Sequence, residues 1–220
     1  FYGCSSLNSV KIGSGVKKGM VALGIDLYIF VRFGDNYELG NDVLASAGPR
    51  YLDTVTGQPL LGVININRET DYTKNNSLRY FEGIIIHELT HVLGFMRFFF
   101  EKYFHNYFTK KDKYGIKRAY INSTRVVDVA KKYFNCNEVD GVELENIEGD
   151  LSSGSHWGAR ILNGEYMTSF ISSQDTAISE FTLALLEDSG YYKANYYTGG
   201  LMKFGKNKGC EFLFSKCVNR

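Results

Sequence analysis

The 220-residue sequence predicts an α+β fold in which two strands precede a long helix and further helices follow. Early in the chain, β-branched and aromatic residues partly alternate with polar ones, as in strands. A helical apolar repeat then replaces this pattern, and Gly or Ser-Gly pairs separate the segments. With 44% hydrophobic residues, a chain of this length can bury one sizeable core or two closely packed lobes.

The first three elements follow in order from local pattern. Residues 21–33 are rich in β-branched and aromatic side chains and end at a Gly-Asp pair, so they predict a strand. Residues 59–66 follow a Thr-Gly turn signal and predict a second strand. Residues 77–94 place apolar side chains at helical spacing, with Ser77 as N-cap and Gly94 just past the end.

The pattern is less regular past Gly94. Residues 98–118 run from three phenylalanines into a Lys-rich stretch, and we interpret them as an insertion or linker whose aromatic start packs in the core or at a lobe interface. Residues 124–135 return to helical spacing, and 141–155 are Gly, Ser and acidic residues typical of a loop. A last helix is expected over residues 179–188.

Composition excludes several classes of protein. The charged fraction of 22% and the hydrophobic content argue against disorder. With 25 Lys and Arg against 24 Asp and Glu, the chain has no basic excess to neutralise phosphates, so we expect no nucleic-acid partner. Charged residues and histidines interrupt the apolar stretches, so membrane association is expected only through segments outside this chain. Because it begins at Phe1, we expect a processed or excerpted piece of a longer protein.

The most informative motif is His87-Glu88-Leu-Thr-His91, inside the predicted long helix. Residues i and i+4 share one helix face, so both imidazoles can reach one metal ion while Glu88 acts on a zinc-bound water as general base. Two histidines on an ordinary amphipathic helix are the alternative interpretation. Chance occurrence of the pattern is about 0.004 per chain of this composition, which favours a zinc hydrolase.

A catalytic zinc ion needs a third protein ligand. The compact pattern HExxHxxGxxH would place it at position 97, where this chain has Arg97, which cannot ligate at neutral pH. The remaining histidines are His105 and His156, with Glu101 as a carboxylate alternative.

The segments Ser155-His156-Trp157-Gly158-Ala159-Arg160 and Gly164-Glu165-Tyr166-Met167-Thr168 resemble the third-ligand and Met-turn region of the leishmanolysin family of surface metalloproteases. That family splits its metal motif with an insertion of about this size; the gap here is 156 − 91 = 65 residues. Further stretches resemble the family at residues 45–49, 62–67, 182–192 and 209–212.

The resemblance implies a metzincin-type zinc protease core. Residues 1–95 would form an N-terminal catalytic lobe with a twisted sheet and the active-site helix. Residues 96–220 would form a mostly helical and loop second lobe with the Met-turn. It implies His87, His91 and His156 as zinc ligands, Glu88 as catalytic acid/base and Met167 as the apolar floor beneath the metal.

The same resemblance implies a monomeric zinc endopeptidase with one Zn²⁺ per chain, protein or peptide substrates, and an extracellular or cell-surface location. Two alternatives stay open. One is a zinc hydrolase with a carboxylate third ligand. The other is a non-catalytic adhesion or binding module that keeps the fold, against which the intact Glu88 argues.

The cysteines, and the positions at which the chain departs from the family pattern, lead to further expectations. Family spacing implies a disulfide between Cys136 and Cys210, and leaves Cys4 and Cys217 without partners in this chain. Gly158 stands where the family usually has Glu. His105 is expected to be a structural or surface residue, and glycosylation sequons begin at Asn75 and Asn122.

Overall fold

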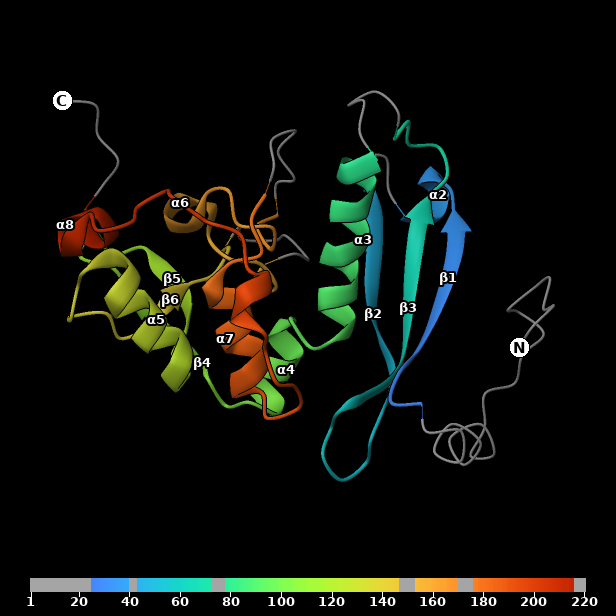
Figure 1. Cartoon of the computed structure of the whole chain (residues 1–220), viewed down its shortest axis with the longest axis horizontal. Coiled ribbons are helices and arrows are strands. Elements are labelled where there is room, and N and C mark those ends of the chain that lie inside the picture. Colours follow the sequence, from blue (N-terminus) through green and yellow to red (C-terminus); the bar gives the residue numbers. More distant parts are fainter. Residues whose placement is uncertain (1–24, 40–42, 73–77, 147–152, 170–175, 216–220) are drawn as a thin grey trace.

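The structure is a computed structural model of the chain, and it describes residues 25–39, 43–72, 78–146, 153–169 and 176–215. This part of the chain has an α+β fold with two three-stranded sheets. Figure 1 shows the first sheet, the short helix α2 (Asn36–Leu39) and the long helix α3 (Leu78–Val92) on one side of the molecule, and the later helices and strands on the other.

The first sheet has the strand order β1-β3-β2. Its strands are β1 (Tyr28–Gly34), β2 (Ala45–Leu52) and β3 (Pro59–Asn67), and the short helix α2 (Asn36–Leu39) follows β1. Strand β3 pairs with β1 in parallel and with β2 in antiparallel orientation. The second predicted strand is therefore confirmed. The first begins at Tyr28 rather than 21, with residues 21–24 outside the described part of the chain.

Helix α3 packs on this sheet through an apolar face. Ile64 and Ile66 of β3 are buried against Val92 of α3. Gly62 makes the close approach possible, because a Cβ built there would lie 2.2 Å from a methyl group of Val92. The absence of a side chain at Gly62 thus sets how near the helix lies to the central strand.

A glycine turn ends α3, as the sequence predicts. Gly94 has φ +119, a conformation that disfavours residues with a Cβ. The backbone N–H of Gly94 donates to His91 O and that of Phe95 to Thr90 O, both at 3.1 Å, which is the Schellman pattern. The reversal returns the Phe95 backbone to the last turn of the helix. Ser77, the predicted N-cap, lies outside the described residues.

Residues 98–118 are not a linker, and their interpretation as an insertion stays a prediction. They contribute to helix α4 and the hairpin β4–β5, and β6 completes the second sheet in the order β4-β5-β6. Phe99 and Phe100 are fully buried, so they anchor α4 in the larger core, while Phe98 is exposed. The elements are α4 (Arg97–Lys102), β4 (Tyr107–Lys111), β5 (Lys117–Ile121) and β6 (Val142–Glu143).

Residues of α4, α5, α7 and β5 all contribute to the larger core. Helices α5 and α7 confirm the two predicted later helices. The larger core buries Trp157, Phe95, Phe134 and Phe181 completely or nearly so. The remaining elements are α5 (Thr124–Phe134), α6 (Ala159–Leu162), α7 (Glu180–Asp188), the 3-10 turn η2 (Tyr196–Thr198) and α8 (Gly209–Phe214). The division into lobes at residue 95 stays a prediction.

One disulfide joins the end of α5 to α8. Cys136 and Cys210 are bonded across 74 residues of sequence, as the family resemblance implies. Cys4 and Cys217 lie outside the described residues, as does the sequon at Asn75; Asn122 is exposed just before α5.

The stretch Tyr80–Lys102 has the length and apolar composition of a membrane span, and 56% of it is buried inside the protein. This is weak evidence for a span, because the core helix of a soluble protein has the same properties. Here α3 ends at Val92 and packs on the sheet, as such a core helix does.

Candidate metal centre

The side chains of three histidines converge beside helix α3. His87 and His91 lie one turn apart on that helix, and His156 comes from the segment before α6. Their Nε2 atoms are 3.1 Å apart for His87 and His91, 3.1 Å for His87 and His156, and 3.2 Å for His91 and His156. All three side chains are buried.

Backbone carbonyls fix the tautomers of the two helical histidines. His87 Nδ1 lies 2.7 Å from Tyr166 O, and His91 Nδ1 lies 2.7 Å from Phe95 O. Since a carbonyl oxygen only accepts hydrogen bonds, each Nδ1 carries the proton and each Nε2 keeps a lone pair. The contact between Nε2 of His87 and Nε2 of His91 is therefore no hydrogen bond, and two lone pairs face each other there.

The turn at Gly94 explains the orientation of His91. Because the Schellman reversal brings the chain back over the last turn of α3, the Phe95 carbonyl reaches the imidazole four residues earlier. The Phe95 ring packs edge-on against Trp157, with the centroids 5.2 Å apart. Trp157 follows His156 directly, so this contact couples the helix end to the segment that supplies the third histidine.

His156 lies at a bend that is held on both sides. Its carbonyl accepts from Glu145 N at 2.8 Å, and the next residue, Trp157, donates its backbone N–H to Met167 O at 2.9 Å. Trp157 also bridges Leu144 in antiparallel and Thr168 in parallel orientation. The backbone of the third histidine is thereby fixed by residues before and after it in the chain.

Burial keeps the two helical imidazoles neutral. It lowers the pKa of His87, and it lowers that of His91 well below 6.5, where the neighbouring His87 and His156 add to the effect. Neutral imidazole is the form that ligates a metal. At pH 7 the helical pair therefore presents unprotonated Nε2 atoms.

Glu88, between the helical histidines, is a buried carboxyl. Burial raises its pKa to about 7, and its Oε2 atom has no hydrogen-bond partner among the described residues. An unpaired buried carboxylate oxygen is costly in a folded protein. Such an atom indicates a group held ready for a ligand or a proton.

The donor set fits a zinc ion. Zinc binds neutral imidazole nitrogen at about 2.0–2.1 Å with tetrahedral geometry, which separates neighbouring ligand atoms by about 3.3 Å. The observed Nε2 separations of 3.1–3.2 Å are close to that value. A cation between them also removes the repulsion between facing lone pairs.

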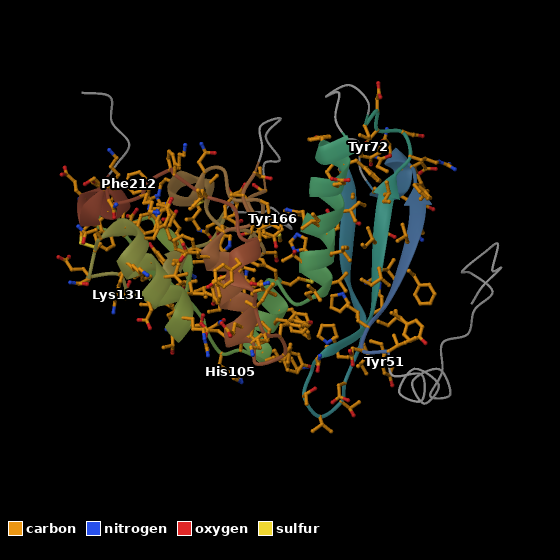
Figure 2. The ribbon with its side chains drawn as sticks, in the orientation of Figure 1. Tyr51, Tyr72, His105, Lys131, Tyr166 and Phe212 are labelled. Carbon is orange, nitrogen blue, oxygen red and sulfur yellow. A yellow bond between two sulfur atoms is a disulfide. The ribbon has the colours of Figure 1, made fainter. Side chains whose placement is uncertain are left out.

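The two alternative ligand candidates, Glu101 and His105, are not part of this cluster. Glu101, the carboxylate alternative, is on α4 and pairs with Arg97 at 2.8 Å. His105 is exposed, with φ 50, and in Figure 2 it lies well away from Tyr166. Met167 is completely buried.

Sequence reasoning did not anticipate the residues that orient the histidines, Tyr166 and Phe95. Both act on the ring through a backbone carbonyl, which any residue type offers, so no residue pattern marks them. Tyr166 adds a side-chain bond: its hydroxyl lies 2.7 Å from Thr90 Oγ1. Since Thr90 Oγ1 donates to Ile86 O, the tyrosine hydroxyl is the donor in this pair.

A buried cluster of three histidines, two of them on one helix, is a donor set of the kind that binds zinc in zinc hydrolases. The sequence profile of the leishmanolysin family of metallopeptidases matches residues 10–220. The chain belongs to this family.

Individual relatives agree. The chain is 38% identical to a leishmanolysin homolog of Crithidia fasciculata over 73% of its length, 32% identical to a ciliated left-right organizer metallopeptidase of Danio rerio over 88%, and 31% identical to leishmanolysin of Leishmania chagasi over 74%. These alignments cover 24%, 33% and 27% of the relatives. The chain thus spans a quarter to a third of their length.

Proposed function

We propose that this chain is the catalytic part of a zinc-dependent endopeptidase with a metzincin-type core. The observation that carries the proposal is the convergence of three buried Nε2 atoms within 3.2 Å of one another, with two of the rings fixed by carbonyls in the metal-binding tautomer. Family membership supports the reaction class.

His87, His91 and His156 would hold one Zn²⁺ per chain. Zinc bound there supplies Lewis acidity, which polarises the scissile carbonyl and lowers the pKa of a water molecule to about 7. Burial of the three imidazoles excludes bulk water from the ligand side of the centre, which strengthens electrostatic interactions inside it.

Glu88 acts as the general acid and base of the reaction. Its carboxylate accepts a proton from the attacking water and delivers it to the nitrogen of the departing amine. The proposal is supported by its position beside His87 and by the buried Oε2 atom, which has no hydrogen-bond partner within the described ranges. A structural carboxylate at this place would be expected to have its oxygens paired.

The remaining assignments follow the family. The substrate is a protein or peptide bound between an N-terminal lobe, residues 1–95, and a second lobe, residues 96–220. Met167 forms the apolar floor of the centre. The cell surface or extracellular space is the expected location, which the Cys136–Cys210 disulfide supports because such bonds persist in oxidising compartments.

The test compares Glu88→Gln with Glu82→Gln, a control that changes an exposed glutamate of the same helix. The zinc-loaded wild-type chain and Glu82→Gln should cleave casein in a chelator-sensitive manner. Glu88→Gln should bind one zinc per chain and lose at least about 10²-fold in rate. Wild-type activity in Glu88→Gln would contradict the role of this carboxylate.

His156→Ala separates this proposal from the alternative with a carboxylate third ligand. Loss of stoichiometric zinc binding is expected, because the described residues around the helical pair contribute no other ligand to the cluster. Retained zinc and turnover would favour the alternative. A wild-type chain that binds zinc without any proteolysis would favour the non-catalytic binding module.

A further inference from the structure

A second buried carboxyl, Glu165, lies outside the catalytic assignments. Its side chain is fully buried, and no ion pair joins it to a basic group within the part of the chain that the structure describes. Burial raises its pKa to about 7. A carboxyl kept in such surroundings requires compensating hydrogen bonds.

Four donors converge on this carboxyl. Oε1 accepts from Thr182 Oγ1 at 2.6 Å, Ser179 Oγ at 2.8 Å and Ser179 N at 3.3 Å, and Oε2 accepts from Met167 N. Ser179 and Thr182 belong to the start of α7. The carboxyl therefore joins the turn at residues 165–168 to the first turn of a helix in the larger core.

One connection leads from Glu165 to His87. The next residue, Tyr166, accepts from His87 Nδ1 through its carbonyl at 2.7 Å and bonds Thr90 on α3 through its hydroxyl. The position of this carbonyl depends on the conformation of the turn. The conformation is held by the bond from Met167 N to the Glu165 carboxyl.

Two further connections lead to the segment of His156. Met167 O accepts from Trp157 N at 2.9 Å, so the turn is bonded to the residue after His156. The indole Nε1 of Trp157 donates to Thr182 Oγ1 at 2.9 Å, and that hydroxyl in turn donates to Glu165. Glu165 is thus linked to two of the three histidines through bonds on the main chain and the side chains.

We infer that Glu165 is a positioning residue of the metal centre, whose carboxyl holds the turn 165–168 and, through Thr182, the Trp157 side chain, and thereby sets His87 and His156 for zinc. This inference rests on the proposed function. In its ionised form the carboxylate is an acceptor-only group, which suits the position because all four neighbouring groups donate to it. A glutamine of the same shape would turn an N–H₂ group toward donors.

The experiment measures the zinc affinity of the purified chain by competition with a chelating dye, without any substrate. Glu165→Gln should weaken zinc binding about tenfold, the lower end of the range for groups that orient metal ligands. Thr182→Val, which removes the relay to Trp157, should weaken it in the same direction. Thr182→Ser, which keeps the hydroxyl, should bind zinc with an affinity within about twofold of the wild type.

Tyr133→Phe is the matched control. The Tyr133 hydroxyl is buried in the same core and bonds Met202 O and Phe204 O, away from the histidines. Its loss should lower the stability of the fold and leave zinc affinity unchanged. Equal zinc affinity in wild type, Glu165→Gln and Thr182→Val, with stability lowered as in Tyr133→Phe, would reduce Glu165 to a structural role and overturn the inference.

Two outcomes separate the inference from the proposed function. A wild-type chain that binds no zinc contradicts the proposed function, and the inference with it. A wild-type chain that binds zinc while both variants match it contradicts the inference alone. If Glu165→Gln fails to fold, the comparison of Thr182→Val with Thr182→Ser decides.

Discussion

The buried carboxyl of Glu165 makes the stability of the metal-free chain depend on pH. Its pKa is raised from 4.5 to about 7 in the fold, so between these values the folded state binds more protons than the unfolded state. Its contribution to stability is therefore fully present below pH 4.5 and is lost as the pH rises through 7. The groups that face it are the hydroxyls of Ser179 and Thr182, the amides of Ser179 and Met167, and the neighbouring Tyr166 phenol.

The magnitude follows from the pKa difference. A rise of the pKa from 4.5 to about 7 corresponds to about 3 kcal/mol, most of which falls between pH 5 and pH 8. Glu165→Gln removes the titrating group. The free energy of unfolding of the wild type, measured relative to this variant, should therefore fall by about 2–3 kcal/mol from pH 5 to pH 8.

The assay is urea unfolding in the presence of a chelator at pH 5, 6, 7 and 8, for wild type and Glu165→Gln side by side. Taking the difference between the two proteins cancels the titration of the histidines and of Glu88, which both retain. A difference that stays constant across this range would refute the reasoning. A difference that grows in favour of the wild type at high pH would reverse its sign.

Four further perturbations follow from the fold. Gly62→Ala should lower the free energy of unfolding by about 1–3 kcal/mol, since its Cβ would lie 2.2 Å from a methyl group of α3. Gly83→Ala on α3, with open space around it, should raise it by up to about 1 kcal/mol in the same chemical denaturation. Replacing Cys136 and Cys210 together with alanine should cost about 4.5 kcal/mol, because the bond closes a loop with a sequence separation of 74; an unchanged midpoint would contradict this. Tyr191→Phe removes the hydrogen bond from the tyrosine hydroxyl to Thr56 O in the β2–β3 loop, at 2.7 Å. It should lower the free energy of unfolding by about 0.5–1.5 kcal/mol, and a raised thermal midpoint would argue against that contact.

The elements that the sequence predicts correctly are those with a strong pattern of apolar residues. Helices α3, α5 and α7 each carry an apolar stripe, and β3 is a short apolar run after a turn signal. Strand β2 was not predicted. It contains Gly48 and Pro49 and lies at the sheet edge, with register shifts beside Pro49, where proline is tolerated but the strand pattern is weak.

The histidines of the candidate metal centre also differ in how far local sequence pattern predicts them. His87 and His91 follow from their spacing on one helix, a local property that the sequence displays directly. His156 lies 65 residues beyond His91, and only the family resemblance selected it over His105 and Glu101. Tertiary structure brings it to the helical pair, so no local pattern could identify it.

The residues that hold the histidines in place through hydrogen bonds could not be predicted from the sequence. Glu165 lies in the segment that resembles the family's Met-turn, but nothing in that segment marks its carboxyl as buried. Its partners Ser179 and Thr182 lie 14 and 17 residues later, at the start of α7. Its burial becomes evident only when the turn and α7 are seen together. Residues whose role is to accept four hydrogen bonds are marked by their surroundings and carry no sequence signature of their own.

The most direct test of the central claim is a zinc K-edge X-ray absorption spectrum of the wild-type chain. The account predicts stoichiometric zinc with three imidazole nitrogens at about 2.0–2.1 Å and one further light ligand. A chain that takes up no zinc, a sulfur ligand at about 2.3 Å, or fewer than three imidazoles would contradict it.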